Sequence, residues 1–330
     1  MKNSPNRHGT FVKMSVLAVL SLFVLTSSLT AQVSLRRALD YDGDGKADAA
    51  VFRPSNNTWY ILKSSDPSSF IARQFGVSTT DVFTPGDYDG DGKGDIAVWR
   101  DTDGTFYFLR SSTDTFGAVQ WGATGDEPVA RNWDGPATSA TEFAVVRRTG
   151  NSMFWYIRDA NGNFRGEQFG IAADYIAPGD YDGDGVFDMG VQRITPNNGQ
   201  ASFYYLTTNS RTFFGTQWGL SNDFAVPGDY DGDGKTDIAV VRDTAGTLNW
   251  YIRSSGGGGN QPGALLSYAW GVSLDDLLVQ NDYDGDGKTD VAVWRDSNGT
   301  FYIRKSSDNQ IQGIKWGTSG DYPIASYDTH

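Results

Sequence analysis

A nine-residue phrase, Asp-Tyr-Asp-Gly-Asp-Gly-x-x-Asp, occurs five times in this chain. Its copies begin at Asp40, Asp87, Asp180, Asp229 and Asp282. The intervals between them are 47, 93, 49 and 53 residues, and the long interval contains a degenerate copy, Asn132-Trp133-Asp134-Gly135. Six units at one fixed period predict a solenoid, a propeller or an array rather than an ordinary globular domain.

Each unit contains four short runs of β-branched and aromatic residues separated by turn residues. In the sixth unit Asp290–Arg295 follows the loop and Thr300–Arg304 follows a turn; in the fourth, a third run ends in Gln217–Gly219 and Ala225–Gly228 leads into the next loop. Such runs are typical of strands, and four strands per unit are typical of propeller blades. We therefore predict an all-β fold, a β-propeller of six four-stranded blades.

A seven-bladed-like ring with an incomplete blade is the alternative. The repeats cover about residues 40–86, 87–131, 132–179, 180–228, 229–281 and 282–328. The strand that precedes a loop is present at both ends, as Leu35–Leu39 and as Tyr322–Ser326. One of the two is expected to complete a terminal blade and close the ring, which leaves no long unpaired edge.

The repeated phrase has the ligand chemistry of a calcium loop. Ca²⁺ takes oxygen ligands, and aspartates at positions 1, 3, 5 and 9 can converge if the backbone curls at the glycines. The carbonyl of position 7 adds an oxygen, and the side chain there is expected to point to solvent. The predicted metal ligands are Asp40, Asp42, Asp44, Lys46 and Asp48; Asp87, Asp89, Asp91, Lys93 and Asp95; Asp180, Asp182, Asp184, Val186 and Asp188; Asp229, Asp231, Asp233, Lys235 and Asp237; and Asp282, Asp284, Asp286, Lys288 and Asp290.

An EF-hand is excluded because position 12 is valine in every copy and lies within a predicted strand. The third copy retains only Asp134 and is expected to hold no ion, so we predict about five Ca²⁺ per chain.

The chain is acidic, with a formal net charge of −13. The five loops hold 20 of the 40 acidic residues (five times four), so the charge is local to them. An acidic chain is a poor partner for nucleic acid. The chain has no cysteine, and its only histidines are His8 and His330. With the carboxylate pairs committed to metal loops, no catalytic residue is predicted and the chain is not expected to be an enzyme.

The N-terminus has the pattern of a secretory signal peptide. Lys2, Arg7 and Lys13 are basic and Met14–Leu25 is apolar but short for a membrane span. We predict a signal peptide over residues 1–31, a single propeller domain over 32–330, no membrane span after cleavage, and a secreted, cell-surface or periplasmic location.

The sequence from Gly86 to Val98 resembles the FG-GAP/VCBS repeat of exported bacterial proteins, which is related to the calcium-bearing blades of the integrin α-subunit head. The resemblance covers residues 35–328. It implies a propeller with each calcium loop between the first and second strands of a blade. Three functions follow as hypotheses: an adhesion or protein-interaction module, a calcium-supported lectin that binds glycans at blade junctions, and, least favoured, a polysaccharide-acting enzyme. The partner would be an extracellular protein or glycan.

Aromatic residues and arginines also recur once per unit. One aromatic set is Trp59, Phe106, Trp155, Tyr204, Trp250 and Phe301; the other is Phe75, Trp121, Phe169, Trp218, Trp270 and Trp316. Either could stack sugars, but packing of one blade on the next is favoured. The arginines that close the second run are expected to pair with loop aspartates or to lie over tryptophan faces.

Overall fold

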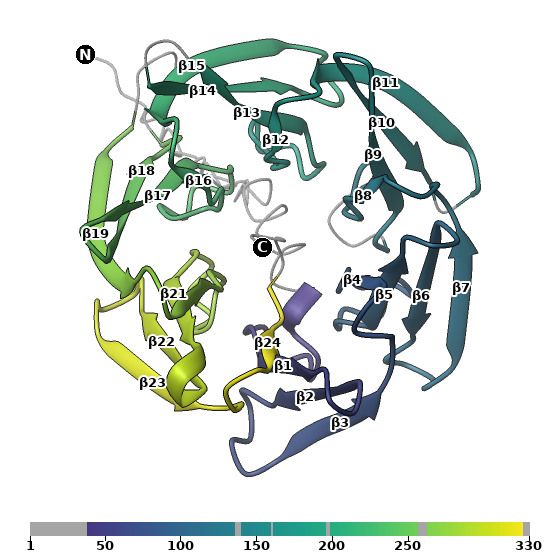
Figure 1. Ribbon diagram of the computed structural model, residues 1–330, viewed down its shortest axis with the longest axis vertical. Coiled ribbons are helices and arrows are strands. Elements are labelled where there is room, and N and C mark those ends of the chain that lie inside the picture. The colour runs from purple at the N-terminus through teal and green to yellow at the C-terminus, as the bar shows by residue number, and fades with distance from the viewer. Residues whose placement is uncertain (1–37, 136–139, 160, 196–198, 257–262, 326–330) are drawn as a thin grey trace, which may run out of the picture.

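The computed structural model describes residues 38–135, 140–159, 161–195, 199–256 and 263–325. They form six antiparallel sheets of four strands arranged as a ring (Figure 1). Within the described residues, helix is limited to Ala38–Leu39 and a short 3-10 turn, Asp296–Asn298. The prediction of six four-stranded blades is confirmed, and the seven-bladed-like alternative is wrong.

In every blade the first strand lies nearest the centre of the ring and the fourth lies outermost (Figure 1). The first blade consists of β24 (Tyr322–Pro323), β1 (Ala49–Arg53), β2 (Thr58–Leu62) and β3 (Phe70–Gln74). The second consists of β4 (Asp81–Phe83), β5 (Ile96–Arg100), β6 (Thr105–Leu109) and β7 (Phe116–Gln120). The third consists of β8 (Glu127–Pro128), β9 (Phe143–Thr149), β10 (Ser152–Arg158) and β11 (Phe164–Ile171).

The other three blades repeat the same order. The fourth consists of β12 (Tyr175–Ile176), β13 (Met189–Thr195), β14 (Gln200–Leu206) and β15 (Phe213–Leu220). The fifth consists of β16 (Phe224–Ala225), β17 (Ile238–Thr244), β18 (Thr247–Arg253) and β19 (Leu265–Val272). The sixth consists of β20 (Asp276–Leu278), β21 (Val291–Arg295), β22 (Thr300–Arg304) and β23 (Ile311–Lys315). In the other five blades the loop therefore connects the first and second strands, whereas in the first blade it precedes β1, because β24 comes from the C-terminal segment.

The C-terminal strand closes the ring. β24 pairs antiparallel with β1, with Val51 opposite Pro323 and Phe52 opposite Tyr322. The amide of Ile324 continues the pairing to the carbonyl of Ala50 at 2.9 Å. At the other end, Ala38 and Leu39 are helical, and the rest of the predicted Leu35–Leu39 strand lies outside the described residues. The strand that completes the first blade thus comes from the C-terminal segment.

The first aromatic set forms the core of the blades. Trp59, Trp155 and Trp250 are 0% exposed, as are Phe106 and Phe301. The fourth blade corrects the prediction: Phe203 occupies this position and is 1% exposed. Tyr204 lies one residue further along, and because successive strand residues face opposite sides, it belongs to a different set. These buried rings match the packing interpretation and leave no face open for a sugar.

The second aromatic set joins neighbouring blades. Phe169 is buried and the other five are half-buried. Four indole N–H groups donate to a backbone carbonyl of the next blade: Trp121 to Tyr156, Trp218 to Tyr251, Trp270 to Tyr302, and Trp316 to Tyr60. The last of these crosses the ring closure at 3.0 Å. The N–H group of an indole packed at an interface needs such a partner, so these residues fix how one blade docks on the next.

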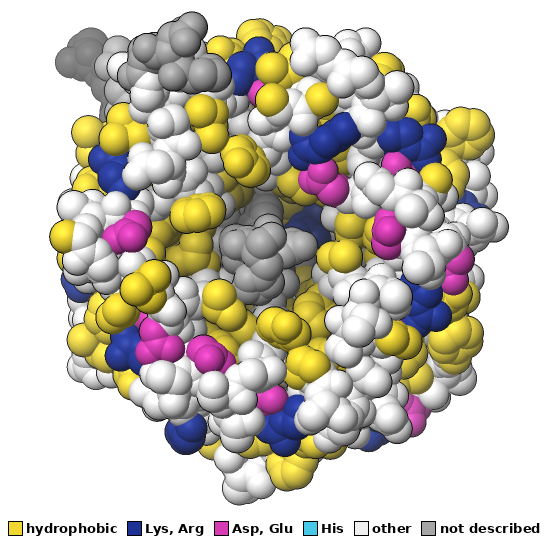
Figure 2. All heavy atoms as spheres, in the orientation of Figure 1, with side chains coloured by type: hydrophobic (Ala, Val, Ile, Leu, Met, Phe, Trp, Pro, Cys, Tyr) yellow, Lys and Arg dark blue, Asp and Glu magenta, His cyan; other side chains and the backbone are white. Residues whose placement is uncertain are grey.

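The repeated arginines form ion pairs at the start of each first strand. Every guanidinium makes two hydrogen bonds to one carboxylate and lies over a tyrosine ring; for Arg100 these are Asp81, with both bonds at 2.8–2.9 Å, and Tyr107 at 4.6 Å. The six pairs are Arg53–Asp321, Arg100–Asp81, Arg147–Asp126, Arg193–Asp174, Arg242–Asp223 and Arg295–Asp276. The predicted partners, loop aspartates or tryptophan faces, are therefore wrong. Figure 2 shows basic and acidic side chains side by side around one face of the ring.

Candidate metal centres

The acidic loops curl around the first aspartate of the phrase. In the first loop Asp40 Oδ1 accepts a hydrogen bond from the amide of Gly43 at 2.6 Å, and Oδ2 accepts one from Gly45 at 2.8 Å. Both glycines have positive φ, 83° and 86°, a conformation that costs other residues energy. The same pair of bonds recurs in all five intact loops. The glycines of the phrase thus serve the curl that the sequence predicted.

Three carboxylates converge in each of these loops. One oxygen from each of positions 1, 3 and 9 lies within 4.8 Å of the other two. The five clusters are Asp40, Asp42 and Asp48; Asp87, Asp89 and Asp95; Asp180, Asp182 and Asp188; Asp229, Asp231 and Asp237; and Asp282, Asp284 and Asp290. Positions 1 and 9 are buried, whereas position 3 is half-buried. Each cluster could hold a metal ion, and hard carboxylate oxygens suit Ca²⁺.

The aspartates at position 5 lie outside these clusters. Asp44 Oδ1 accepts the amide of Lys46 at 2.9 Å and the hydroxyl of Ser64 at 2.8 Å. Position 9 also contacts this turn, since the amide of Ser64 donates to Asp48 Oδ1 at 2.7 Å. The turn between the third and fourth strands therefore braces the loop. The assignment of position 5 and of the position 7 carbonyl as ligands remains a prediction.

Burial disfavours the charged form of the clustered carboxylates. Burial raises the pKa of Asp48, Asp95 and Asp290 to about 7, and that of Asp188 and Asp237 to about 8. Neighbouring aspartates add to the increase by like-charge repulsion. A carboxylate in such a position is stabilised by a bound cation, which offsets both effects.

The six loops are connected by hydrogen bonds into a closed circle. In each loop the amide of position 8 donates to the position 1 carbonyl of the loop before it. The six bonds run from Gly94 to Asp40, Thr141 to Asp87, Phe187 to Asn132, Thr236 to Asp180, Thr289 to Asp229, and Ala47 to Asp282, at 2.6–2.8 Å. The residue that begins each cluster is thus also a contact between blades. The conformation of each loop and the docking of neighbouring blades therefore depend on each other.

The position 7 lysines make a contact that the sequence did not predict. Each lies against the position 4 glycine of the preceding loop: a Cβ on Gly43 would meet Lys93 Cε at 2.9 Å. The other three pairs are Lys235 with Gly183, Lys288 with Gly232, and Lys46 with Gly285. Val186, the exception, follows the degenerate third loop, so the lysine is missing where the acidic cluster before it is missing too.

The third loop is organised without an acidic triad. The amide of Trp133 donates to Glu142 Oε2 at 2.7 Å, the role that position 9 aspartates play elsewhere. Arg165 of β11 donates to the Trp133 carbonyl at 3.0 Å, and its charge acts on Glu142. At the equivalent place β3 has Ile71 and β15 has Phe214. Sequence reasoning missed Glu142 because a longer loop separates it from Asn132.

Comparisons with known proteins agree with this architecture. Residues 40–98 match the profile of the FG-GAP-like repeat. The chain is therefore a six-bladed β-propeller, and one stretch of it, residues 40–98, is similar to the FG-GAP-like repeat. No curated protein matches the sequence.

Among solved structures, the chain is similar to one titled "Dihydro-heme d1 dehydrogenase NirN in complex with DHE", at 12% identity. The match covers 87% of this chain and 76% of that one, with a TM-score of 0.41. A similarity this low carries no inference about function. Within the described residues, no helix has both the length and the apolar character required to cross a bilayer.

Proposed function

We propose that this protein is an exported, calcium-binding β-propeller that acts as an adhesion or protein-interaction module. The observation that carries the proposal is the fivefold recurrence of a buried aspartate triad, each at the junction of two blades. Buried like charges need compensation, and Ca²⁺ supplies it with the ligand type present. The ion would stabilise the ring, and the rigid ring would present surface loops to a partner.

Metal analysis tests the calcium part of the proposal. Protein purified in Ca²⁺ and dialysed against metal-free buffer should retain about five ions per chain, and the ions should be removable by a chelator. An ion content near zero, together with a melting temperature that chelation leaves unchanged, would refute it.

The interaction role needs a partner screen. Mature protein immobilised in millimolar Ca²⁺ should retain an extracellular or envelope protein that chelator releases. The matched control is the same column carrying a variant with all five position 3 aspartates changed to asparagine. Equal recovery from both columns would count against a calcium-supported interaction.

A lectin is the second candidate, and the outer wall of the ring favours it. The first residue of every outermost strand is a large apolar residue that is 55–72% exposed: Phe70, Phe116, Phe164, Phe213, Leu265 and Ile311. Four of these lie against an aromatic ring of the preceding blade, as Phe70 does against Trp316 at 5.6 Å. Exposed aromatic pairs at blade junctions suit sugar faces. A glycan array in millimolar Ca²⁺ separates the two candidates.

The proposed role is binding rather than catalysis, and export is part of it. The predicted signal peptide over residues 1–31 lies outside the described residues. Expression with the native N-terminus in a bacterial host, followed by N-terminal sequencing of the exported protein, tests cleavage after Ala31. Incubation with a broad polysaccharide panel, followed by assay for reducing ends and unsaturated products, tests the absence of turnover.

A further inference from the structure

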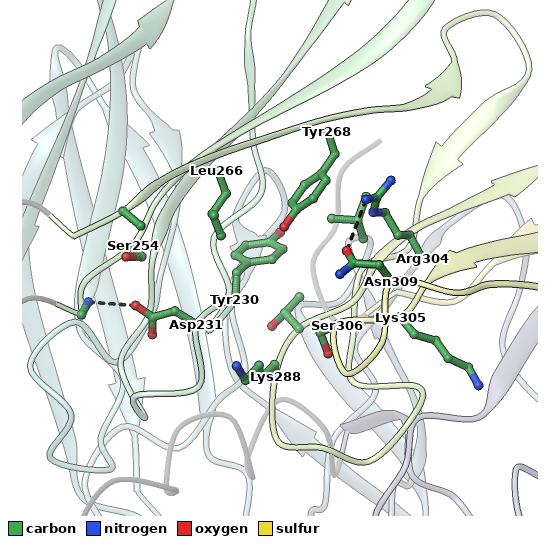
Figure 3. Close-up of a pocket in the computed structure, with 14 residues that line it drawn as sticks. Tyr230, Asp231, Ser254, Leu266, Tyr268, Lys288, Arg304, Lys305, Ser306 and Asn309 are labelled. Atoms are coloured by element: carbon green, nitrogen blue, oxygen red, sulfur yellow. Dashed lines mark hydrogen bonds between the residues drawn. The ribbon is translucent and has the colours of Figure 1, made fainter.

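The junction between the fifth and sixth blades contains a groove of about 360 Å³ (Figure 3). Its walls come from β19 and the fifth acidic loop on one side, and from β22 and the sixth acidic loop on the other. Leu266 and Val291 are apolar, whereas Tyr268, Arg304 and Asn309 provide polar groups. This volume lies within the range of small-molecule sites, about 300–1,000 Å³.

Arg304 is the central polar group of the groove. Its guanidinium lies 4.7 Å from the centre of the Tyr268 ring, and Nη2 donates to Asn309 Oδ1 at 3.2 Å. Its Nε is buried without a hydrogen-bond partner, and within the described residues it forms no ion pair. A guanidinium held by a ring and an amide, with no carboxylate of its own, is oriented for an anion from outside.

The charges around Arg304 are also one-sided. Lys288 lies along the same groove, while Lys305 points away from its centre (Figure 3). Among the described residues that line the groove, Asp231 is the only acidic one, and it belongs to the cluster of Asp229, Asp231 and Asp237. Its carboxylate is held by the amide of Gly256 at 3.0 Å rather than by Arg304. The Arg304 end of the groove is therefore positive.

Two other junctions are closed at the same place by ion pairs of the chain itself. At the first junction, Arg73 and Asp114 occupy the positions of Tyr268 and Asn309 and pair at 3.4 Å. At the third junction, Glu167 and Arg211 form the corresponding pair. The groove at the first junction is smaller, about 120 Å³, and has Leu109 in place of Arg304. The fifth junction thus differs from the first in size and in charge, and among the described residues it has no ion pair like those of the first and third junctions.

We propose that this groove binds a carboxylate-bearing sugar, with the hexuronate carboxylate on Arg304 and the ring against Leu266 and Val291. A planar guanidinium matches a carboxylate in two parallel hydrogen bonds. An apolar wall beside polar groups suits a sugar ring, whose C–H faces are apolar and whose rim of hydroxyls is polar. A protein partner would need roughly 800 Å² of surface, whereas this pocket takes a group of about one ring. Sugar binding at this groove can therefore be tested independently of the adhesion role.

The test is ligand-observed NMR titration of the intact mature protein in saturating Ca²⁺. The probes are a glucuronate-containing trisaccharide, its neutral glucose counterpart, and a short glutamate peptide. The glucuronate sugar should bind, the neutral sugar should bind at least tenfold more weakly, and raising the salt should weaken binding because the attraction is partly electrostatic.

Arg304→Leu is the decisive variant, because leucine occupies this position in three other blades as Leu62, Leu109 and Leu206. It should keep the melting temperature and lower the affinity for the glucuronate sugar about tenfold or more, as expected for a charge-assisted bond. Arg304→Lys should retain part of the affinity. Arg253→Leu, the same change in the fifth blade, should have no effect.

Three results would overturn the proposal. They are equal binding of the acidic and neutral sugars, unchanged affinity in Arg304→Leu, and binding of the glutamate peptide without binding of the sugar. The last would assign the groove to an acidic protein segment instead. Loss of the envelope partner, by contrast, would leave the sugar result unaffected and bear only on the adhesion role.

Discussion

Substitution of Asp89 by asparagine isolates the contribution of one ion to the stability of the ring. Asp89 Oδ1 accepts the amide of Asp91 at 3.3 Å, and Oδ2 accepts the hydroxyl of Ser112 at 2.5 Å. Asparagine can keep both contacts, since its oxygen accepts the amide and its NH₂ can donate to the hydroxyl. What changes is the charge of the second cluster. The variant therefore removes a metal ligand with little effect on packing.

Whether Asp89→Asn stabilises or destabilises the fold should depend on calcium. Without the ion, Asp89 only repels Asp87 and Asp95, and after burial its charge contributes to raising the pKa of Asp95 to about 7. Asp89→Asn should then be neutral or stabilising. With Kd on the order of 10⁻⁴ M and 10 mM Ca²⁺, one bound ion stabilises the fold by about 2.7 kcal/mol. Loss of that ion lowers the melting temperature by about 5 °C for a domain of this size.

Thermal unfolding in 10 mM Ca²⁺ and in excess chelator measures the effect of the substitution with and without the ion. Five such sites amount to roughly 13 kcal/mol (five times 2.7), so each single-loop variant should lose about a fifth of the calcium-induced shift. Asp103→Asn is the matched control, because Asp103 bonds the Tyr107 hydroxyl and belongs to no cluster. If Asp89→Asn destabilises the protein equally with and without calcium, the carboxylate is structural and the calcium argument fails.

Three further variants probe the repeat. Arg100→Met leaves the carboxylate of Asp81, 2% exposed, without its bidentate partner and should cost roughly 2–4 kcal/mol, measured by urea unfolding. An effect below about 0.5 kcal/mol, the scale of exposed ion pairs, would show that the pair stabilises the fold no more than a surface pair does. Trp316→Phe removes the hydrogen bond from the indole to the Tyr60 carbonyl at the ring closure and should lower the free energy of unfolding by about 1 kcal/mol. An unchanged free energy of unfolding would show that the closure does not depend on this bond. Burial first, then a hydrogen bond to Asp134, raises the pKa of Glu142 from 4.5 to about 9, so the folded chain holds a proton that the unfolded chain releases. Stability should fall as pH rises from about 4.5 to about 9, and the difference in melting temperature between Glu142→Gln and the parent should grow over that window; a constant difference would refute the assignment.

The fold could be predicted because its information is repeated. The period gives the number of blades, and the phrase gives the place of each loop, so errors in single strands do not accumulate. What could not be predicted depends on contacts between repeats. Asp81 and its equivalents precede a strand of only two or three residues, and nothing in the spacing connects them to Arg100. The ring closure likewise required a choice between two chain ends with the same local pattern.

For the candidate metal sites, too, the features within one repeat could be predicted and the contacts between repeats could not. Aspartates at positions 1, 3 and 9 converge because short-range curl at the glycines brings them together. The role of the position 7 lysine was missed because its contact, the position 4 glycine, is in the preceding blade. A pattern within one repeat indicates what the repeat does alone, whereas the charges that balance it come from its neighbour.

The exceptions to the repeat concern the positive charges beside the loops. Where the acidic triad is missing, in the third loop, Arg165 lies near Glu142 and the following blade carries Val186 instead of lysine. Positive charge is thus placed beside four of the five intact loops by lysines, and beside the degenerate loop by an arginine from its own blade. At the second loop, Gly90 faces Ala140 instead of a lysine. Because the loops are hydrogen-bonded in a circle, a third loop that needs no ion would hold its two neighbours in place when calcium is scarce. The asymmetry then has a consequence: removal of calcium should loosen the ring first at the junctions far from the third blade.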